Sequence, residues 1–189
     1  MGEPKLEQRY SYADYLTWSD DERWELIDGT PYNMSPAPKR MHQETELYLA
    51  RKIGDFLEGK PCKVYIAPFD VVLSEKDTND ELIDTVVQPD ISVICDTSKL
   101  NDAGCKGAPD FIIEILSQST ALKDATTKKD LYEKSGVKEY WLVDTGTKSI
   151  RVYLLKNGKY GFATCYERDM KIKVNSLKGL TIKLEDAFE

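Results

Sequence analysis

PDFIIEILS, residues 109–117, is the most apolar stretch of the chain, and it predicts a buried strand at the centre of a sheet. The next segment, STALKDATTKKDLYEKSG at 119–136, begins with Ser and Thr and ends with Gly, which predicts a helix. EYWLVDT at 139–145 then predicts a second strand. Because a strand, a helix and a strand in this order are typical of a right-handed parallel crossover, the sequence predicts an α/β fold.

On either side of this unit the chain adds a long helix and two hairpins. Residues 41–59 (MHQETELYLARKIGDFLEG) carry apolar side chains at helical spacing and predict an amphipathic helix that ends near its last glycine. Asp28-Gly29 and Asn157-Gly158 each separate two alternating runs and predict tight hairpin turns. We therefore expect a single domain over all 189 residues, with a mixed β-sheet flanked by helices and an antiparallel hairpin extension at the C-terminal side.

Length and composition limit the class of protein. A chain of 189 residues with 41% apolar residues can bury one substantial core. No apolar stretch is long enough to span a bilayer, and the polar, acidic N-terminus is unlike an export signal, so a cytoplasmic protein is expected. The cysteines show no Cys-x-x-Cys pair, so neither a zinc site nor a disulfide framework is predicted. Reduced thiols are expected at Cys62, Cys95, Cys105 and Cys165.

The net charge of −7 argues against a protein that coats nucleic acid without specificity, since phosphate contacts rely on lysine and arginine. It does not exclude catalysis on nucleic acid. A metal-dependent phosphodiesterase needs a local acidic cluster to hold its cation, and nearby basic side chains can then dock the substrate. Lysines gather at 123–138, although the interleaved acidic residues also fit a solvated helix face.

Glu114 is the first candidate site residue, because it lies inside an apolar strand. An unpaired charge is costly to remove from water, so this carboxylate requires a metal, a cation or hydrogen bonds. Asp110 shares its face of the strand, but four residues at about 3.3 Å each separate the two side chains by roughly 13 Å. Asp90, at the start of the run QPDISVIC, is the expected partner, because a neighbouring strand lies only about 4.8 Å away.

Lys128 is the third candidate, on the helix predicted to follow the Glu114 strand. Asp124, Lys128 and Tyr132 recur every four residues and therefore share one helix face. If that face looks toward the sheet, the ammonium group can stabilise negative charge that develops on a scissile phosphate. The alternative is an exposed Asp124–Lys128 pair that contributes about 0.3 to 0.5 kcal/mol and has no catalytic role.

Taken together, several motifs resemble the bacterial "putative restriction endonuclease" family of the PD-(D/E)XK nuclease superfamily. They are WELIDG at 24–29, MSPAP at 34–38 followed by His42, QPDISVI at 88–94, GAPDFIIEILSQST at 107–120, the run from Asp124 and Lys128 to Tyr132, and GVKEYWLVD at 136–144. The resemblance extends from about Tyr12 to the terminal hairpin. It implies a restriction-endonuclease-like fold.

The resemblance also implies roles for individual residues. Asp90 takes the place of the first acid of the superfamily motif and Glu114 that of the second, and both would ligate Mg²⁺ or Mn²⁺. The backbone carbonyl of Ile115 would complete the shell of the ion. The chain departs from the motif at Leu116, where a lysine is expected, and Lys128 matches a lysine that has moved to the next helix.

Other acidic residues and His42 could complete this site. His42 matches a family position and would assist a proton transfer or contact phosphate, or else bond to backbone at the start of a helix. Glu25 and Asp70 are strand acids that would extend the acidic cluster.

We therefore expect a divalent-metal-dependent endonuclease that hydrolyses DNA as a homodimer. Leu116 and the acidic net charge leave open a catalytically inactive module that binds nucleic acid or a protein, and a hydrolase of small phosphodiesters is a third alternative.

Overall fold

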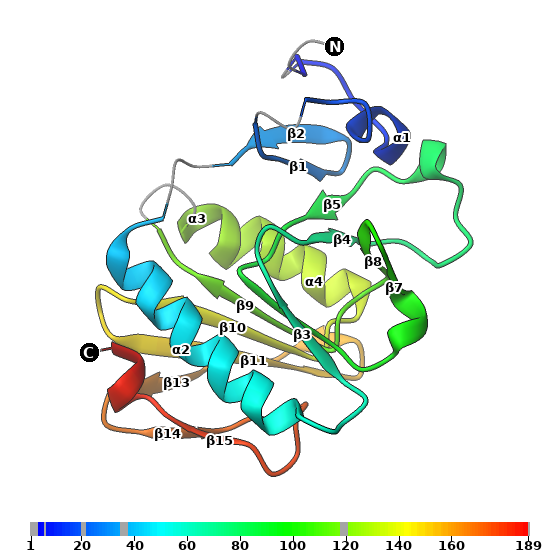
Figure 1. Ribbon diagram of the computed structural model, residues 1–189. Helices are drawn as coiled ribbons and strands as arrows, with labels where there is room; N and C mark the ends of the chain where they lie inside the picture. Colours follow the sequence, from blue (N-terminus) through cyan, green and yellow to red (C-terminus); the bar gives the residue numbers. More distant parts are fainter. Residues whose placement is uncertain (1–3, 6, 20–21, 35–37, 118–120, 189) are drawn as a thin grey trace.

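The strands form two mixed sheets and a separate hairpin (Figure 1). The computed structural model describes residues 4–5, 7–19, 22–34, 38–117 and 121–188, so parts of two motifs quoted above, at 35–37 and 118–120, lie outside the described residues. The larger sheet has the order β12-β11-β10-β9-β6-β3, with β13 paired to β11. Its strands are β3 (Lys63–Ile66), β6 (Ile91–Ile94), β9 (Phe111–Ile115), β10 (Glu139–Asp144), β11 (Ser149–Lys156), β12 (Lys159–Tyr160) and β13 (Thr164–Glu167).

The second sheet has the order β2-β1-β5-β4-β8-β7 and lies on the N-terminal side of the molecule. Its strands are β1 (Trp24–Ile27), β2 (Thr30–Asn33), β4 (Asp70–Val72), β5 (Val86–Val87), β7 (Leu100–Asn101) and β8 (Gly104–Lys106). The separate C-terminal hairpin pairs β14 (Lys171–Lys173) with β15 (Thr181–Lys183).

The helical segments are fewer than the strands. They are α1 (Tyr12–Tyr15), α2 (Arg40–Leu57), α3 (Ala121–Lys123), the π-helix η3 (Asp124–Lys128), α4 (Lys129–Ser135) and the 3₁₀ turns η1 (Asp80–Leu82), η2 (Thr97–Lys99) and η4 (Glu185–Phe188). Within the described ranges, none of the helices combines the length and the apolar composition needed to cross a bilayer.

The predicted crossover is confirmed. β9 lies between β6 and β10 in the larger sheet, and it pairs with β10 in parallel, with Ile113 opposite Trp141. The helix between them is not regular, because a π-helical segment interrupts it at η3. All five residues of β9 are buried, which is what its unbroken apolar run requires.

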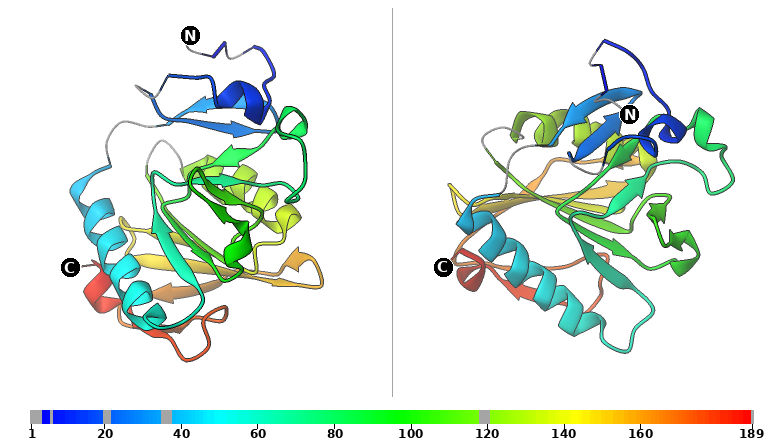
Figure 2. Two further views of the ribbon diagram at one scale, coloured as in Figure 1. Left: turned by 45° about the vertical axis from the view of Figure 1, so that its right-hand side comes forward. Right: turned by 45° about the horizontal axis from the view of Figure 1, so that its top comes forward.

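The two faces of the larger sheet are covered by different elements, so β9 contributes to two cores. Phe111, Ile113 and Ile115 pack with α2 residues such as Leu49 in one cluster. Ile112 packs with residues of α4 and of the second sheet in another cluster. Figure 2 shows α2 and the α3–α4 helix on opposite sides of β9 and β10. The even-numbered positions of β9, Glu114 among them, therefore face the layer formed by α4 and the second sheet.

Both predicted turns are confirmed. Asp28 and Gly29 have φ values of 46° and 74° between β1 and β2, and Asn157 and Gly158 have 52° and 76° between β11 and β12. Two consecutive residues with positive φ give the turn whose twist matches that of paired strands. The first of these turns holds β1, and thus Glu25, in the second sheet.

The expectation of reduced thiols is wrong for one pair of cysteines. Cys62 and Cys95 form a disulfide. They flank β3 and β6, whose register places Lys63 opposite Ile94, so pairing of the strands brings the two cysteines together. Cys105 and Cys165 carry free thiols.

Gly104 has the tightest backbone contact of the second sheet. It lies opposite Asp70 where β8 pairs with β4 in parallel, its φ is 148°, and an added Cβ would come within 2.2 Å of the Asp70 carbonyl oxygen. Gly104→Ala should therefore lower the free energy of unfolding by at least about 3 kcal/mol, because backbone must move.

Gly158→Ala is the matched control for Gly104→Ala. Its φ is 76°, but no described atom lies within 4 Å of the added Cβ, so only the backbone strain of about 1 kcal/mol is expected. Urea unfolding of both variants measures the difference. Equal losses of stability would contradict the close approach at Gly104.

Candidate active site

Asp90, directly before β6, and Glu114, on β9, occupy neighbouring positions in the larger sheet. The two strands are antiparallel with Ile91 opposite Ile113, so the next pair in this register is Asp90 and Glu114. The Asp90 carboxylate accepts a hydrogen bond of 2.6 Å from the backbone N–H of Ile115. Three sequence candidates, Asp90, Glu114 and Ile115, are thus neighbours in the sheet, and their roles as metal ligands stay a prediction.

Glu114 is buried and held by two donors. Its Oε1 atom accepts a hydrogen bond of 2.7 Å from the Tyr132 hydroxyl and one of 2.9 Å from the Lys128 ammonium group. Burial raises the pKa of Glu114 against the opposing influence of Lys128, and the nearby carboxylates of Asp124, Asp90 and Glu25 add to the rise. The carboxyl group therefore takes a proton more readily than an exposed glutamate.

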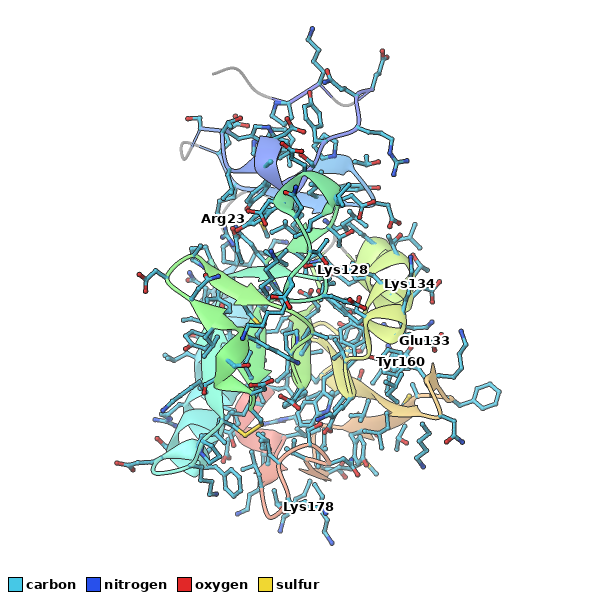
Figure 3. The ribbon with its side chains drawn as sticks, turned by 90° about the vertical axis from the view of Figure 1, so that its right-hand side faces the viewer. Arg23, Lys128, Glu133, Lys134, Tyr160 and Lys178 are labelled. Atoms are coloured by element: carbon cyan, nitrogen blue, oxygen red, sulfur yellow. A yellow bond between two sulfur atoms is a disulfide. The ribbon has the colours of Figure 1, made fainter. Side chains whose placement is uncertain are left out.

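Lys128 is enclosed by carboxylates, which overturns the alternative of an exposed helix pair. Its Nζ atom lies 2.7 Å from Glu25 Oε1, 2.9 Å from Glu114 Oε1 and 3.7 Å from Asp124 Oδ1, and only 4% of its side chain is exposed. Burial alone would lower the pKa of Lys128, but the three carboxylates hold it well above its usual value. In Figure 3 this lysine lies beside the α3–α4 helix, on the side of the N-terminal strands. The charged form is thus available for electrostatic stabilisation.

Glu25 holds two lysines at once. Its side chain is fully buried on β1, and its Oε1 and Oε2 atoms lie 2.7 Å from Lys128 and 2.7 Å from Lys123 respectively. Gln88 also donates its backbone N–H to Oε1 at 3.1 Å. Burial alone would raise the pKa of Glu25, but the two ammonium groups hold it below its usual value. The acidic cluster extends to Glu25 from a different sheet than the one that carries Glu114.

The π-helix η3 allows Lys123 and Lys128 to contact Glu25 at the same time. In an α-helix each residue turns by about 100°, so residues five apart point about 140° apart. A π-helix closes its hydrogen bonds from i to i+5, so residues five apart follow each other on one side. Lys123 directly precedes η3, Lys128 is its last residue, and both reach Glu25. Periodicity in the sequence carries no sign of this segment.

His42 joins the site from the first turn of α2. Its Nε2 atom lies 3.3 Å from Asp90 Oδ2, and it also hydrogen-bonds to the backbone of Ile115. The backbone contact expected as one alternative is therefore present, the contact with Asp90 was not predicted, and a role in proton transfer or phosphate contact stays a prediction. Burial would lower the pKa of His42, but the hydrogen bond and the charge of Asp90 raise it above the usual value.

Sequence reasoning missed Glu46, which lies one helical turn after His42. Its Oε2 atom is 3.8 Å from His42 Nδ1. Burial, together with the charge of Asp90, raises the pKa of Glu46 to about 7. The spacing of four residues on one helix face was the signal that could have found it. Tyr132 was recognised as part of a motif, but its hydrogen bond to Glu114 was not predicted.

Asp70 and Asp110 do not join the cluster. Asp70 accepts hydrogen bonds from the Tyr15 hydroxyl at 3.0 Å and the Gln88 side chain at 2.8 Å. Asp110 accepts from the Cys95 N–H at 2.8 Å and from Lys138 at 2.6 Å. The expectation that Asp70 would extend the acidic cluster is therefore wrong, whereas the exclusion of Asp110 by its spacing along the strand is consistent with these contacts.

The donor atoms fit a small divalent cation. No group of three or more His, Cys, Asp or Glu side chains among the described residues is arranged to hold a metal by itself. Asp90 and Glu114 offer two carboxylates, however, and Mg²⁺ usually binds proteins through one or two carboxylates while it keeps several waters. The set of oxygen ligands suits Mg²⁺ or Mn²⁺ rather than zinc.

Three comparisons relate the chain to known proteins. The model of the Uma2 family, described as "Putative restriction endonuclease", matches residues 12–185. An uncharacterized protein of Synechocystis sp. (strain ATCC 27184 / PCC 6803 / Kazusa) is 25% identical over 187 residues, which cover 96% of this chain and 90% of that protein. The crystal structure of a putative nuclease from Anabaena variabilis has a TM-score of 0.75 at 20% identity, over 94% of this chain and 97% of that one. The predicted restriction-endonuclease-like fold, a mixed sheet flanked by helices, is confirmed.

Proposed function

The chain belongs to the Uma2 family of putative restriction endonucleases, and on that premise we propose that it is a divalent-metal-dependent endonuclease that hydrolyses phosphodiester bonds in DNA. The observation that supports this proposal best is the contact between the buried Glu114 carboxylate and the buried Lys128 ammonium group, 2.9 Å apart, beside Asp90. A buried acid on a strand and a buried cation on the helix that follows it suit a reaction in which negative charge develops on a phosphate.

In this proposal the cation site is formed by Asp90, Glu114 and the Ile115 carbonyl. Mg²⁺ or Mn²⁺ held by these groups would lower the pKa of a bound water and polarise the phosphate. Tyr132 holds Glu114 Oε1 in place, so the carboxylate does not have to reorganise when substrate arrives. His42, against Asp90, is positioned to move a proton at its Nε2 atom.

Lys128 stabilises the developing charge, and Glu25 is its positioning residue. The Glu25 carboxylate keeps the ammonium group in the site independently of Glu114, because the contact at 2.7 Å does not involve Glu114. The relocated lysine thereby performs the role that Leu116 cannot.

Cleavage of supercoiled plasmid tests the proposed function. The wild-type protein should convert supercoiled plasmid to nicked and linear forms in Mg²⁺ or Mn²⁺, and excess EDTA should abolish the reaction. Cleavage that returns when excess Mn²⁺ is added shows that EDTA removed the metal and did not inactivate the protein. Cleavage that persists at full rate in EDTA, or a pure wild-type protein that never cuts DNA under any of these conditions, would refute the proposal. Turnover of a chromogenic diester without DNA cleavage would instead favour a hydrolase of small phosphodiesters.

A catalytically inactive module is the second candidate, and Leu116 in the usual lysine position favours it. Calorimetric titration with Mn²⁺ distinguishes the two. The proposed nuclease should bind Mn²⁺, and Asp90→Asn should weaken the binding at least about tenfold, because one of its two carboxylate ligands is lost. A wild-type protein that takes up no Mn²⁺ would support the inactive module.

A homodimer is the assembly that we propose for cutting both strands of a duplex. One such site cleaves one strand at a time, and a two-fold pair presents a second site to the other strand. Sedimentation at several protein concentrations tests this, and a monomer at all of them would contradict it.

A further inference from the structure

Arg23 is an exposed cation held beside the candidate active site. It directly precedes β1, which is antiparallel to β5 with Leu26 opposite Val86, so Arg23 lies beside the segment that leads from β5 to Asp90. Its Nε and Nη2 atoms donate hydrogen bonds of 3.1 and 2.8 Å to Gln88 Oε1. The guanidinium group is therefore fixed by a neutral acceptor that leaves its charge in place.

The orientation of Gln88 is itself fixed by hydrogen bonds. Its Nε2 atom donates to Asp70 Oδ1 at 2.8 Å, and the Tyr15 hydroxyl donates to the same oxygen at 3.0 Å. A carboxylate oxygen accepts hydrogen bonds and donates none, so the amide must turn its NH₂ group to Asp70 and its oxygen to Arg23. Asp70, which does not belong to the acidic cluster, thereby fixes the orientation of the Gln88 amide.

The positive charge of Arg23 acts on Glu46, which lies beside the candidate active site. Burial and the charge of Asp90 raise the pKa of Glu46, and the positive charge of Arg23 opposes that rise. Glu46 in turn lies 3.8 Å from His42, which contacts Asp90. The register of β1 and β5, continued past the two strands, places Arg23 opposite Pro89, next to Asp90, so Arg23 is close enough to the proposed cleavage site to act on the same stretch of a bound strand.

We propose that Arg23 binds a backbone phosphate of the nucleic-acid strand next to the scissile bond, and that Gln88 holds the guanidinium group ready for that contact. The inference rests on the proposed function, since it takes the strand to pass Asp90. Gln88 uses two of the five N–H donors of a guanidinium group, so three remain to form the paired hydrogen bonds that suit phosphate oxygens.

Salt-dependent binding tests the phosphate contact without any need for catalysis. Anisotropy of a fluorescein-labelled duplex, measured in EDTA over a range of NaCl concentrations, gives the affinity and its salt slope. Arg23→Gln should weaken binding about tenfold at low salt and reduce the slope of log Kobs against log[salt] by about 0.9, the value for one lost phosphate contact. Lys178→Gln is the control, because this exposed lysine lies at the far end of the molecule in Figure 3. It should change neither quantity. A folded Arg23→Gln protein with the wild-type slope would overturn the proposal.

Gln88→Met tests the part played by the amide. The variant keeps the charge of Arg23, so it should retain the wild-type salt slope. The Arg23 side chain is no longer held by Gln88 and must become ordered when the nucleic acid binds, so binding should be several-fold weaker. Thermal melts confirm that each variant is folded. Wild-type affinity for Gln88→Met would refute the positioning role.

The outcomes separate this inference from the proposed function. If the wild-type protein binds and cuts DNA while Arg23→Gln behaves like it, only the phosphate contact fails. If the wild-type protein neither binds nor cuts DNA, the proposed function is refuted, and the phosphate contact that rests on it is refuted with it.

Discussion

Glu114→Gln is expected to reduce plasmid cleavage at least about a thousandfold, the equivalent of about 4 kcal/mol in the activation free energy. The amide keeps the shape of the side chain and an oxygen for the bonds from Lys128 and Tyr132, but it removes the negative charge that would ligate the cation. Initial rates of nicking in Mg²⁺ measure the effect, and circular dichroism shows whether the fold persists. Wild-type rates from a pure Glu114→Gln protein would end the metal-site assignment.

Asp110→Asn is the matched control, since Asp110 is the other acid of the same apolar segment. Its carboxylate binds the Cys95 N–H and Lys138, away from Lys128. We expect its cleavage rate to stay within about twofold of wild type, while the free energy of unfolding falls by about 1 to 2 kcal/mol because two charge-assisted bonds weaken. A loss of activity as large as that of Glu114→Gln would show that cleavage falls because the fold is destabilised, and not because a metal ligand is lost.

Lys128→Met should both inactivate and destabilise the protein. Removal of the ammonium group leaves the buried carboxylates of Glu25 and Glu114 without their shared cation, which is expected to cost about 3 to 5 kcal/mol of stability. Cleavage should fall at least about a hundredfold, since stabilisation of the developing phosphate charge is lost. Urea unfolding and nicking assays below the unfolding temperature measure the two effects.

A double variant separates the two effects of Lys128→Met. In Glu25→Gln/Lys128→Met one of the two buried carboxylates that shared the Lys128 ammonium group is neutralised, which lowers the repulsion between Glu25 and Glu114, so the double variant should be more stable than the single one. Its cleavage should remain as low as that of Lys128→Met. Recovery of activity along with stability would mean that Lys128 serves the fold and not the reaction.

The fold could be predicted because its signals are local. The unbroken apolar run of β9, the helical spacing in α2 and the turn dipeptides each act over a few residues. Asp90 was found because strand spacing excluded Asp110 and required an acid from a neighbouring strand. These inferences need only the geometry of one strand or one helix.

Other features depend on contacts between distant segments and could not be read from the chain. Glu25 finds Lys128 only after the second sheet packs over the α3–α4 helix, and Cys62 finds Cys95 only when β3 pairs with β6. The π-helix η3 replaces a regular helix where periodicity gave no warning. The buried state of Lys128 likewise required knowledge of what covers its helix.

The position of Glu25 on β1 sets the smallest version of the protein that could work. A truncated chain that begins at α2 would retain Asp90, Glu114 and Lys128, yet it would lack the carboxylate that holds Lys128 and Lys123. β1, which pairs with β2, therefore contributes a buried carboxylate directly against the Lys128 ammonium group. Shortened versions intended for engineering should accordingly keep the N-terminal strands, even though the acids of the motif all lie downstream of them.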